Sequence, residues 1–260
     1  MSAKPQVARA TVAGRQQLAE GVFSYWLECP GIASSVKPGQ FVQVRVNDTF
    51  EPFLSRPLSV AQQQAGRIRL VFRVVGRGTA VLAQSKIGDT WNLLGPLGRE
   101  IPRLQDRDIV LVGGGVGIAP LLFLAEKAAS RNRTVILLGA RDKPDLILRR
   151  EFRRLPAVLS FATEDGSLGK KGLVTDLLGV VRTALPSKTL VIACGPRPML
   201  RRVKEIAQSP PRIEAYGFWE ERMGCGTGIC YGCAVRSARG GNYIRFCQEG
   251  PVLNLKDIRL

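Results

Sequence analysis

The sequence predicts a multidomain chain: an antiparallel Greek-key β-barrel, an α/β domain with a parallel sheet, and a small cysteine-rich C-terminal module. Apolar and polar residues alternate with period two before about residue 105, strands alternate with helical stretches after it, and four cysteines fall within residues 225–247. A chain of 260 residues exceeds the usual size of one domain. We therefore expect domains at 1–104, 105–215 and 216–260.

Two segments of the first part show the alternation most clearly. Residues 42–47 read Val-Gln-Val-Arg-Val-Asn, and residues 68–74 read Ile-Arg-Leu-Val-Phe-Arg-Val. Such segments, separated by Gly and Pro, predict antiparallel strands that close most economically into a small barrel. Helical periodicity is confined to a short stretch near residues 79–84.

Two basic motifs follow strand segments of this barrel. One is Arg56–Ser59, and the other is Arg73–Thr79, which leads into the short helix through Gly76 and Gly78. These motifs suit a pyrophosphate, because they offer a guanidinium, hydroxyl groups and the N-terminus of a helix that is preceded by glycine. A barrel with basic rims is the alternative interpretation of these motifs alone.

The middle of the chain contains a strand, a glycine-rich loop and a helix within residues 108–131. The apolar run Ile109–Val112 predicts a buried parallel strand, and the glycines after it leave the backbone bare at a helix start, which suits a pyrophosphate. The G-x-G-x-x-G fingerprint is absent, however, and the next strand, 134–138, is followed by Gly139, Ala140 and Arg141 rather than an acid. By itself the loop leaves a nucleotide site and a packing turn both open.

Two further strands complete the predicted parallel sheet. They span residues 158–163 and 189–193, and the second runs into Cys194–Leu200, which reads CGPRPML. Ligands of such sheets bind at the carboxyl ends of the strands, where both the glycine loop and this motif fall.

The four clustered cysteines are Cys225, Cys230, Cys233 and Cys247. Their C-x4-C-x2-C spacing, with a fourth cysteine later, is typical of plant-type [2Fe–2S] ligands. Glycines within the loop allow the backbone to curl around a cluster and point N–H groups at its sulfurs. A zinc site would normally show two C-x2-C pairs, and disulfides need an oxidising compartment. Cys29 and Cys194 are interpreted as ordinary buried cysteines.

Composition narrows the function further. The chain has no histidine, which excludes Ser–His–Asp, Cys–His and His-ligated zinc chemistry, so a cofactor is expected to carry the reaction and no catalytic side chain is assigned. The net charge is +17, but the basic residues are scattered without interleaved aromatics, which disfavours nucleic acid and favours an acidic protein partner or solubility. Residues 109–125 are too interrupted by glycines for a membrane span, and no signal peptide is seen, so a cytoplasmic location is expected.

The order of RPLS, RVVGRGT, GPLG, GGGVGIAP, CGPRPML and CGTGIC-x2-C…C resembles the ferredoxin-reductase superfamily over almost the whole chain. Within it, the chain resembles the electron-transfer subunits of class 1B dihydroorotate dehydrogenases. This resemblance implies FAD on the barrel, NAD on the α/β domain and a [2Fe–2S] cluster on the C-terminal module.

The resemblance also implies roles for individual residues. FAD would be held by Arg56, Pro57, Leu58 and Ser59, lined by Val71, Phe72 and Arg73, and its pyrophosphate received by Gly78 and Thr79. NAD would contact Gly114, Gly115 and Gly117 within the stretch 114–119, and Cys194, Gly195 and Pro196 within 194–199. Cys225, Cys230, Cys233 and Cys247 would be the cluster ligands.

The implied function is an electron relay in pyrimidine biosynthesis between a dihydroorotate-oxidising flavoprotein and NAD⁺, in a heterotetramer with two copies of each chain. In related subunits of sulfide dehydrogenase or transhydrogenase complexes an acid often stands in place of the first cysteine, so Cys225 favours the dihydroorotate system. Glu249 departs from the Asp of the family's C-x-D-G-P ending. The alternatives are an NAD(P)H-dependent reductase serving an oxygenase, hydrogenase or sulfur-reducing partner, and a basic binding protein with a redox-sensing cluster. The choice between NAD and NADP stays open, because Arg141 could meet a 2′-phosphate.

Overall fold

The structure is a computed structural model that describes residues 4–46, 49, 51–101, 104, 106–186 and 188–259. Its contacts divide the chain into two compact units. The first contains residues 1–100, 220–235 and 243–251, and the second contains 101–219, 236–242 and 252–260. The predicted boundaries at 104 and 215 stay a prediction. No helix in the described part of the chain is long and apolar enough to span a membrane.

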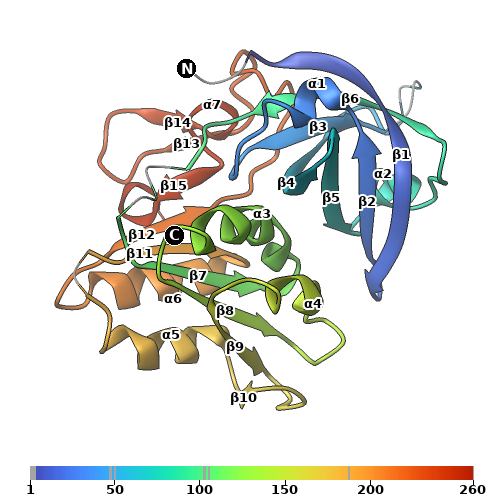
Figure 1. Cartoon of the computed structure of the whole chain (residues 1–260). Coiled ribbons are helices and arrows are strands. Elements are labelled where there is room, and N and C mark those ends of the chain that lie inside the picture. Colours follow the sequence, from blue (N-terminus) through green and yellow to red (C-terminus); the bar gives the residue numbers. More distant parts are fainter. Residues whose placement is uncertain are drawn as a thin grey trace. The chain divides into compact units, whose positions relative to one another are not determined.

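The first unit is built on a closed antiparallel barrel with the order β1-β2-β5-β4-β3-β6 (Figure 1). This order, in which β3 and β4 insert between β5 and β6, confirms the predicted Greek-key barrel. Its strands are β1 (Gln6–Ala19), β2 (Val22–Glu28), β3 (Phe41–Arg45), β4 (Arg56–Gln64), β5 (Arg67–Arg73) and β6 (Thr90–Leu97). Its helices are α1 (Pro30–Ala33), a single turn too short to show a helical period, and α2 (Arg77–Leu82).

The barrel core follows from the alternation seen in the sequence. Val42 and Val44 of β3 are fully buried, and Tyr25 of β2 stacks on Phe72 of β5 with ring centroids 5.8 Å apart. The Tyr25 hydroxyl donates to the carbonyl oxygen of Ala83 at 3.0 Å, which satisfies its polar end at the end of α2. This packing fixes α2 against the barrel wall.

The second unit contains a seven-stranded sheet with the order β10-β9-β8-β7-β11-β12-β15 (Figure 1). All neighbours pair in parallel except β12 and β15, which are antiparallel. The strands are β7 (Ile109–Gly114), β8 (Thr134–Ala140), β9 (Val158–Thr163), β10 (Lys170–Lys171), β11 (Leu190–Cys194), β12 (Glu214–Phe218) and β15 (Val252–Asn254). The helices are η1 (Gly115–Gly117), α3 (Ile118–Ala129), α4 (Arg149–Phe152), α5 (Val174–Arg182), α6 (Arg197–Gln208) and η2 (Leu255–Asp257).

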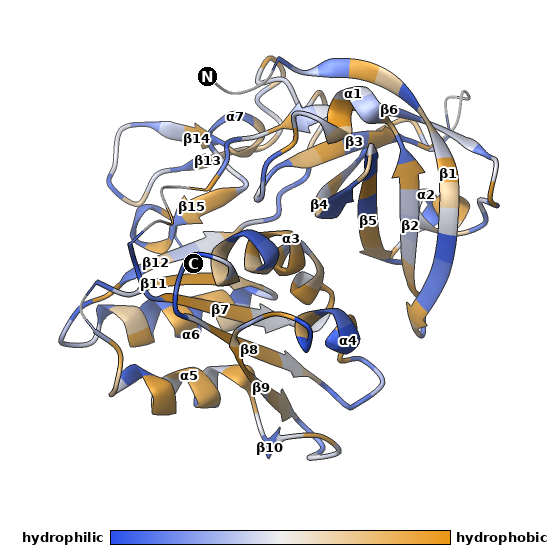
Figure 2. Cartoon of the chain, viewed as in Figure 1, coloured by the Kyte–Doolittle hydropathy of each residue, from blue (hydrophilic) through white to orange (hydrophobic). Residues whose placement is uncertain are grey.

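Burial explains why the central strands read as continuous apolar runs. Every residue of β7 is buried, and all of α3 is buried except Glu126 and Lys127. Hydrophobic residues likewise dominate β8, most of which is buried (Figure 2). A parallel strand covered by helices on both faces has no polar side to alternate with. The predicted α/β domain is thereby confirmed.

The direction of winding reverses at β7. From β7 the chain moves to β8 and β9 on one side, then returns to place β11 on the other. The carboxyl ends of β7 and β11 therefore form the topological switch point, which is where open parallel sheets bind their ligands.

The C-terminal segment carries short elements. They are β13 (Ala234–Arg236), which pairs with β14 (Tyr243–Arg245), and α7 (Phe246–Glu249), which precedes β15. Within the first unit, Arg99 donates its backbone N–H to the carbonyl oxygen of Gly250 at 2.7 Å. This bond ties the end of the cysteine-rich segment to the end of the barrel.

Candidate functional site

Arg56 and Gly78 are in direct contact at one end of the barrel. Arg56 begins β4, and Gly78 lies in the first turn of α2. A Cβ atom at Gly78 would fall 2.3 Å from the Arg56 Nε atom, so the guanidinium occupies the space that a side chain would need. The structure thus brings together two of the residues expected to hold the FAD phosphates.

Thr79 shapes the turn that leads into α2. Its hydroxyl accepts hydrogen bonds from the backbone N–H groups of Val75 at 3.0 Å and Gly76 at 3.2 Å, and donates to the Gly76 carbonyl oxygen at 3.0 Å. The first N–H groups of a helix have no partner within the helix. The hydroxyl therefore organises the loop so that the helix start is presented to a ligand.

The remaining residues expected around FAD lie on β4 and β5, which are neighbours in the barrel. Pro57 and Ser59 are partly exposed, whereas Leu58 is 9% exposed. Val71 and Phe72 are buried, and Arg73 donates from Nη1 to the carbonyl oxygen of Glu20 at 3.3 Å.

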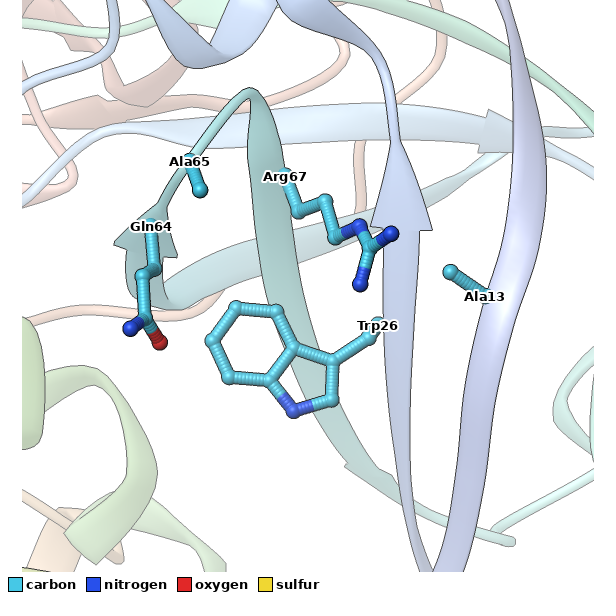
Figure 3. A pocket seen from close by; sticks show the side chains of 5 residues that line it. All are labelled: Ala13, Trp26, Gln64, Ala65 and Arg67. Atoms are coloured by element: carbon cyan, nitrogen blue, oxygen red, sulfur yellow. The ribbon is translucent and has the colours of Figure 1, made fainter.

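One pocket on the barrel wall lies apart from these motifs. It is lined by Ala13, Trp26, Gln64, Ala65 and Arg67 (Figure 3). None of the residues expected to bind FAD lines this pocket, and we do not assign FAD to it.

The glycine loop after β7 and the CGPRPML motif after β11 meet at the switch point. Gly113 and Cys194 are register partners, and a Cβ at Gly117 would lie 2.5 Å from the Cys194 carbonyl oxygen. Met199 packs beneath the loops, because Cβ atoms at Gly114 and Gly195 would each come within 2.6 Å of its thioether. Gly117 is thus needed for close backbone packing, and Gly114 and Gly195 for the seat of Met199. Together they leave an open backbone surface for a dinucleotide.

Arg141 lies just after β8, where a side chain could bind the 2′-phosphate that distinguishes NADP from NAD. It forms a two-pronged ion pair with Asp145, with Nε and Nη2 at 2.9 and 2.7 Å from Oδ2. The Asp145 hydrogen bond and charge raise the pKa of Arg141, and Asp142 and Glu164 act in the same direction. The guanidinium is therefore already matched by carboxylates.

The four clustered cysteines form two pairs of neighbouring thiols. The backbone N–H groups of Cys225 and Cys230 each donate to the Sγ atom of the other, at 3.4 and 3.5 Å, and the Cys247 N–H donates to the Cys233 Sγ at 3.5 Å. Backbone N–H groups also point at the sulfurs: Thr227 N lies 3.3 Å from the Cys225 Sγ, and Gly232 N lies 3.4 Å from the Cys230 Sγ. All six cysteines of the chain are free thiols, so the alternative of a disulfide framework is not supported.

The two pairs differ in their electrostatics. Burial tends to raise the pKa of Cys225, but hydrogen bonds from Thr227 and Cys230 outweigh it and hold that pKa at about 6. Burial, followed by the hydrogen bond with Cys233, raises the pKa of Cys247 to about 12. The Cys225 side chain thus favours the thiolate, the form that binds iron.

This donor set fits a binuclear cluster. Within the described residues, no group of three or more Cys, Asp or Glu converges as the ligands of one metal ion would. Each iron of a [2Fe–2S] cluster takes two thiolates, and Cys225 with Cys230 and Cys233 with Cys247 are such pairs.

Comparison with known proteins assigns a family to each part of the chain. Residues 9–100 match an oxidoreductase FAD-binding domain, and residues 111–205 match an oxidoreductase NAD-binding domain. Residues 220–259 match the iron–sulfur cluster binding domain of dihydroorotate dehydrogenase B. A "Dihydroorotate dehydrogenase B (NAD(+)), electron transfer subunit" of Desulforamulus reducens is 40% identical over 88% of this chain and 90% of its own length. The chain belongs to the family of dihydroorotate dehydrogenase B electron transfer subunits.

Other members and relatives cover the chain as completely. The electron transfer subunit of the same name from Bacillus velezensis is 35% identical over 97% of this chain and 99% of its own. Among solved structures, a chain of an NADH-dependent reduced ferredoxin-NADP oxidoreductase, described for flavin-based electron bifurcation, superimposes with a TM-score of 0.88. It is 31% identical and covers 97% of this chain and 90% of that one. Like its family, the chain is an oxidoreductase with FAD, NAD and iron–sulfur domains.

Two residues of this family member were missed by sequence reasoning. Glu249, noted only as a departure from Asp, accepts from the Arg245 backbone N–H at 2.7 Å and from its guanidinium at 3.2 Å, so it braces the turn before Cys247. Gln43 was seen only as a polar residue of an alternating strand, yet its side chain is 3% exposed. The alternation of residues along a strand does not show which distant segment of the chain covers the polar side of that strand.

Proposed function

We propose that this chain is the subunit that relays electrons from a dihydroorotate-oxidising flavoprotein to NAD⁺ in pyrimidine biosynthesis. The observation that carries the proposal is the pairing of Cys225 with Cys230 and of Cys233 with Cys247. It occurs in a chain that is similar over nearly its whole length to subunits of that name. When bound, a [2Fe–2S] cluster supplies one-electron transfer, and FAD couples it to the two-electron chemistry of the nicotinamide. The protein positions these groups and adjusts their potentials.

On the barrel, FAD is held at the contact between β4 and the start of α2. Arg56 offers its guanidinium to the pyrophosphate, and the backbone of Gly78 and Thr79 offers N–H groups at the helix start. Pro57, Leu58 and Ser59 continue along β4, and Val71, Phe72 and Arg73 line the neighbouring β5. Support comes from the direct packing of Arg56 on Gly78.

On the parallel sheet, the dinucleotide is held at the switch point by backbone rather than by side chains. The proposed contacts are Gly114, Gly115 and Gly117 after β7, and Cys194, Gly195 and Pro196 after β11. The carboxylates around Arg141 favour NAD over NADP, because a 2′-phosphate there would meet Asp142, Asp145 and Glu164 as well as the guanidinium.

In the cysteine-rich segment, Cys225, Cys230, Cys233 and Cys247 are the proposed cluster ligands. Cys230 is exposed, and the large apolar side chains beside it are exposed too: Ile229 by 82% and Tyr231 by 58%. Exposed apolar residues next to a redox centre suit a protein partner that must approach closely. We propose that the catalytic flavoprotein docks there, with two copies of each chain in a cytoplasmic heterotetramer.

The proposal is tested by reconstitution. The purified chain is mixed anaerobically with a dihydroorotate-oxidising flavoprotein from the same source, and NADH formation is followed by absorbance. Activity that needs both chains supports the proposal, and light scattering of the mixture measures the stoichiometry. Absence of NADH formation, while NADH still reduces the cofactors of this chain, contradicts the dihydroorotate role.

One observation favours a second candidate, an NAD(P)H-dependent reductase that delivers electrons to another partner. It is the similarity to the ferredoxin-NADP oxidoreductase chain, at 31% identity with a TM-score of 0.88. Reduction of ferredoxin by NADH or NADPH in the presence of this chain, without dihydroorotate activity, would place this candidate first.

A further inference from the structure

Gln43 presents a polar side chain that nothing in the described chain satisfies. It lies in β3, is 3% exposed, and neither its Nε2 nor its Oε1 atom has a hydrogen-bond partner among the described residues. A buried amide without a partner destabilises the protein, because it has given up its hydrogen bonds to water without replacing them. A group absent from the chain itself is therefore expected to meet this amide.

The surroundings of Gln43 indicate which group that is. Its side chain packs on Gly226, the residue after Cys225, so closely that a Cβ at Gly226 would lie 2.9 Å from the Gln43 Cγ and 3.2 Å from its Nε2. The Leu97 Cδ1 atom lies 3.0 Å from the same Cβ position. Gly226 has φ +74°, a conformation that favours glycine, so the loop bends here to bring its backbone onto the amide.

A second buried glutamine nearby shows what a purely structural amide does. Gln40, 2% exposed, accepts from the Lys37 N–H at 2.9 Å and donates to the Gly98 carbonyl oxygen at 2.9 Å. Both of its polar ends are used within the barrel. Gln43, three residues later and equally buried, has neither bond and faces the cysteine loop instead.

We propose that the Gln43 amide donates a hydrogen bond from Nε2 to a sulfur atom of the iron–sulfur cluster, reaching it from the barrel side of the loop. This rests on the proposed function only through the four cysteine ligands. A donor to sulfur stabilises the reduced cluster, whose negative charge is greater, and so raises its reduction potential. Gln43 is thus a positioning and tuning residue contributed by the FAD-binding barrel to the cluster.

The test is a redox titration of the holoprotein, following the EPR signal of the reduced cluster. Gln43→Met and Gln43→Leu remove the donor and leave an apolar side chain, and Gln40→Met is the matched control at the buried glutamine just before β3. We expect both Gln43 variants to lower the equilibrium constant for cluster reduction about tenfold, or 59 mV for a one-electron couple. The control is expected to lower thermal stability and leave the potential unchanged.

The outcomes separate this inference from the proposed function. An unchanged cluster potential in both Gln43 variants overturns the inference, as does a shift confined to the flavin. If neither Gln43 variant assembles a cluster but Gln40→Met does, the result supports the contact between Gln43 and the cluster. If all three variants lose the cluster to the same extent, the result contradicts that contact. A wild-type chain that binds no iron–sulfur cluster refutes the ligand assignment itself.

Discussion

Gly117 and Cys194 hold the two ligand-facing turns of the parallel sheet together. The Gly117 Cα is so close to the backbone of Cys194 that a Cβ would fall 2.5 Å from its carbonyl oxygen and 2.6 Å from its carbonyl carbon. Neither turn can move away without opening the junction between β7 and β11. Residues 77 positions apart in sequence thus fix the shape of one surface.

Gly117→Ala is expected to impair NAD binding selectively. The methyl group must push the glycine loop away from Cys194, because backbone atoms cannot yield as a flexible side chain can. We expect at least about a tenfold rise in the NAD⁺ concentration for half-saturation, equivalent to about 1.4 kcal/mol. Titration of NADH-dependent flavin reduction measures it.

Gly179→Ala is the matched control for this change. Gly179 lies inside α5, and nothing lies within 4 Å of its Cβ position. The substitution is expected to leave NAD binding intact and to stabilise the protein by up to about 1 kcal/mol, because alanine favours helix over glycine. If Gly179→Ala also weakened NAD binding, the effect of Gly117→Ala could not be attributed to its contact with Cys194.

Arg56→Ala is expected to release FAD. The variant removes the guanidinium that fills the space above Gly78, and with it the proposed charge partner of the pyrophosphate. We expect FAD affinity to fall by at least about tenfold, since charge-assisted hydrogen bonds contribute about 1.5–3 kcal/mol. Flavin content after gel filtration checks this. Arg67→Ala makes the same charge change in the separate pocket of Figure 3 and should retain FAD.

Cys230→Ser is expected to lose the iron–sulfur cluster and keep FAD. The serine oxygen is a poor replacement for a thiolate ligand, and the barrel that holds the flavin does not depend on the loop cysteine. Iron and sulfide analysis, with the flavin spectrum of the same sample, checks both parts. Cys29→Ser alters a buried thiol of the barrel and should keep full iron content; iron loss there would undermine the ligand assignment.

Titration of the buried Cys29 thiol is expected to lower the free energy of unfolding at high pH. Burial raises its pKa from 9.0 to about 11. The unfolded chain therefore releases this proton first as the pH rises, so the stabilising contribution is complete below pH 9 and is lost between pH 9 and 11. The loss amounts to about 2–3 kcal/mol for a two-unit shift.

Chemical denaturation at several pH values measures this effect. The difference in unfolding free energy between the wild type and Cys29→Ala should shrink from pH 9 to pH 11. A difference that stays constant over this range would show that the thiol does not titrate with folding.

Much of the architecture could be predicted because local patterns and global structure agree. The two alternating segments fall on β3 and β5, whose apolar residues are buried in the barrel, and the run Ile109–Val112 lies in a strand that is buried along its whole length. The motifs GGGVGIAP and CGPRPML could be assigned to one surface because the carboxyl ends of parallel strands meet at one edge.

Long-range packing is what the sequence did not reveal. β15 has only three residues, too few to show a period, and it becomes a strand because β12 offers it an edge. Gln43 looks like a solvent-facing residue of an alternating strand, and it is buried because Gly226, more than 180 positions later, covers it. The alternation of the strand therefore gives no sign that the Gln43 amide is buried.

The most direct test of the account follows electrons into this chain from its partner. The partner flavoprotein is reduced with dihydroorotate and mixed anaerobically with this chain, while cluster and flavin absorbance are recorded. We expect both centres of the wild type to be reduced by the partner. We expect the flavin of Cys230→Ser to stay oxidised in the same mixture, although NADH still reduces it. Fast flavin reduction in Cys230→Ser, or no reduction of the wild type by the partner, would contradict the relay.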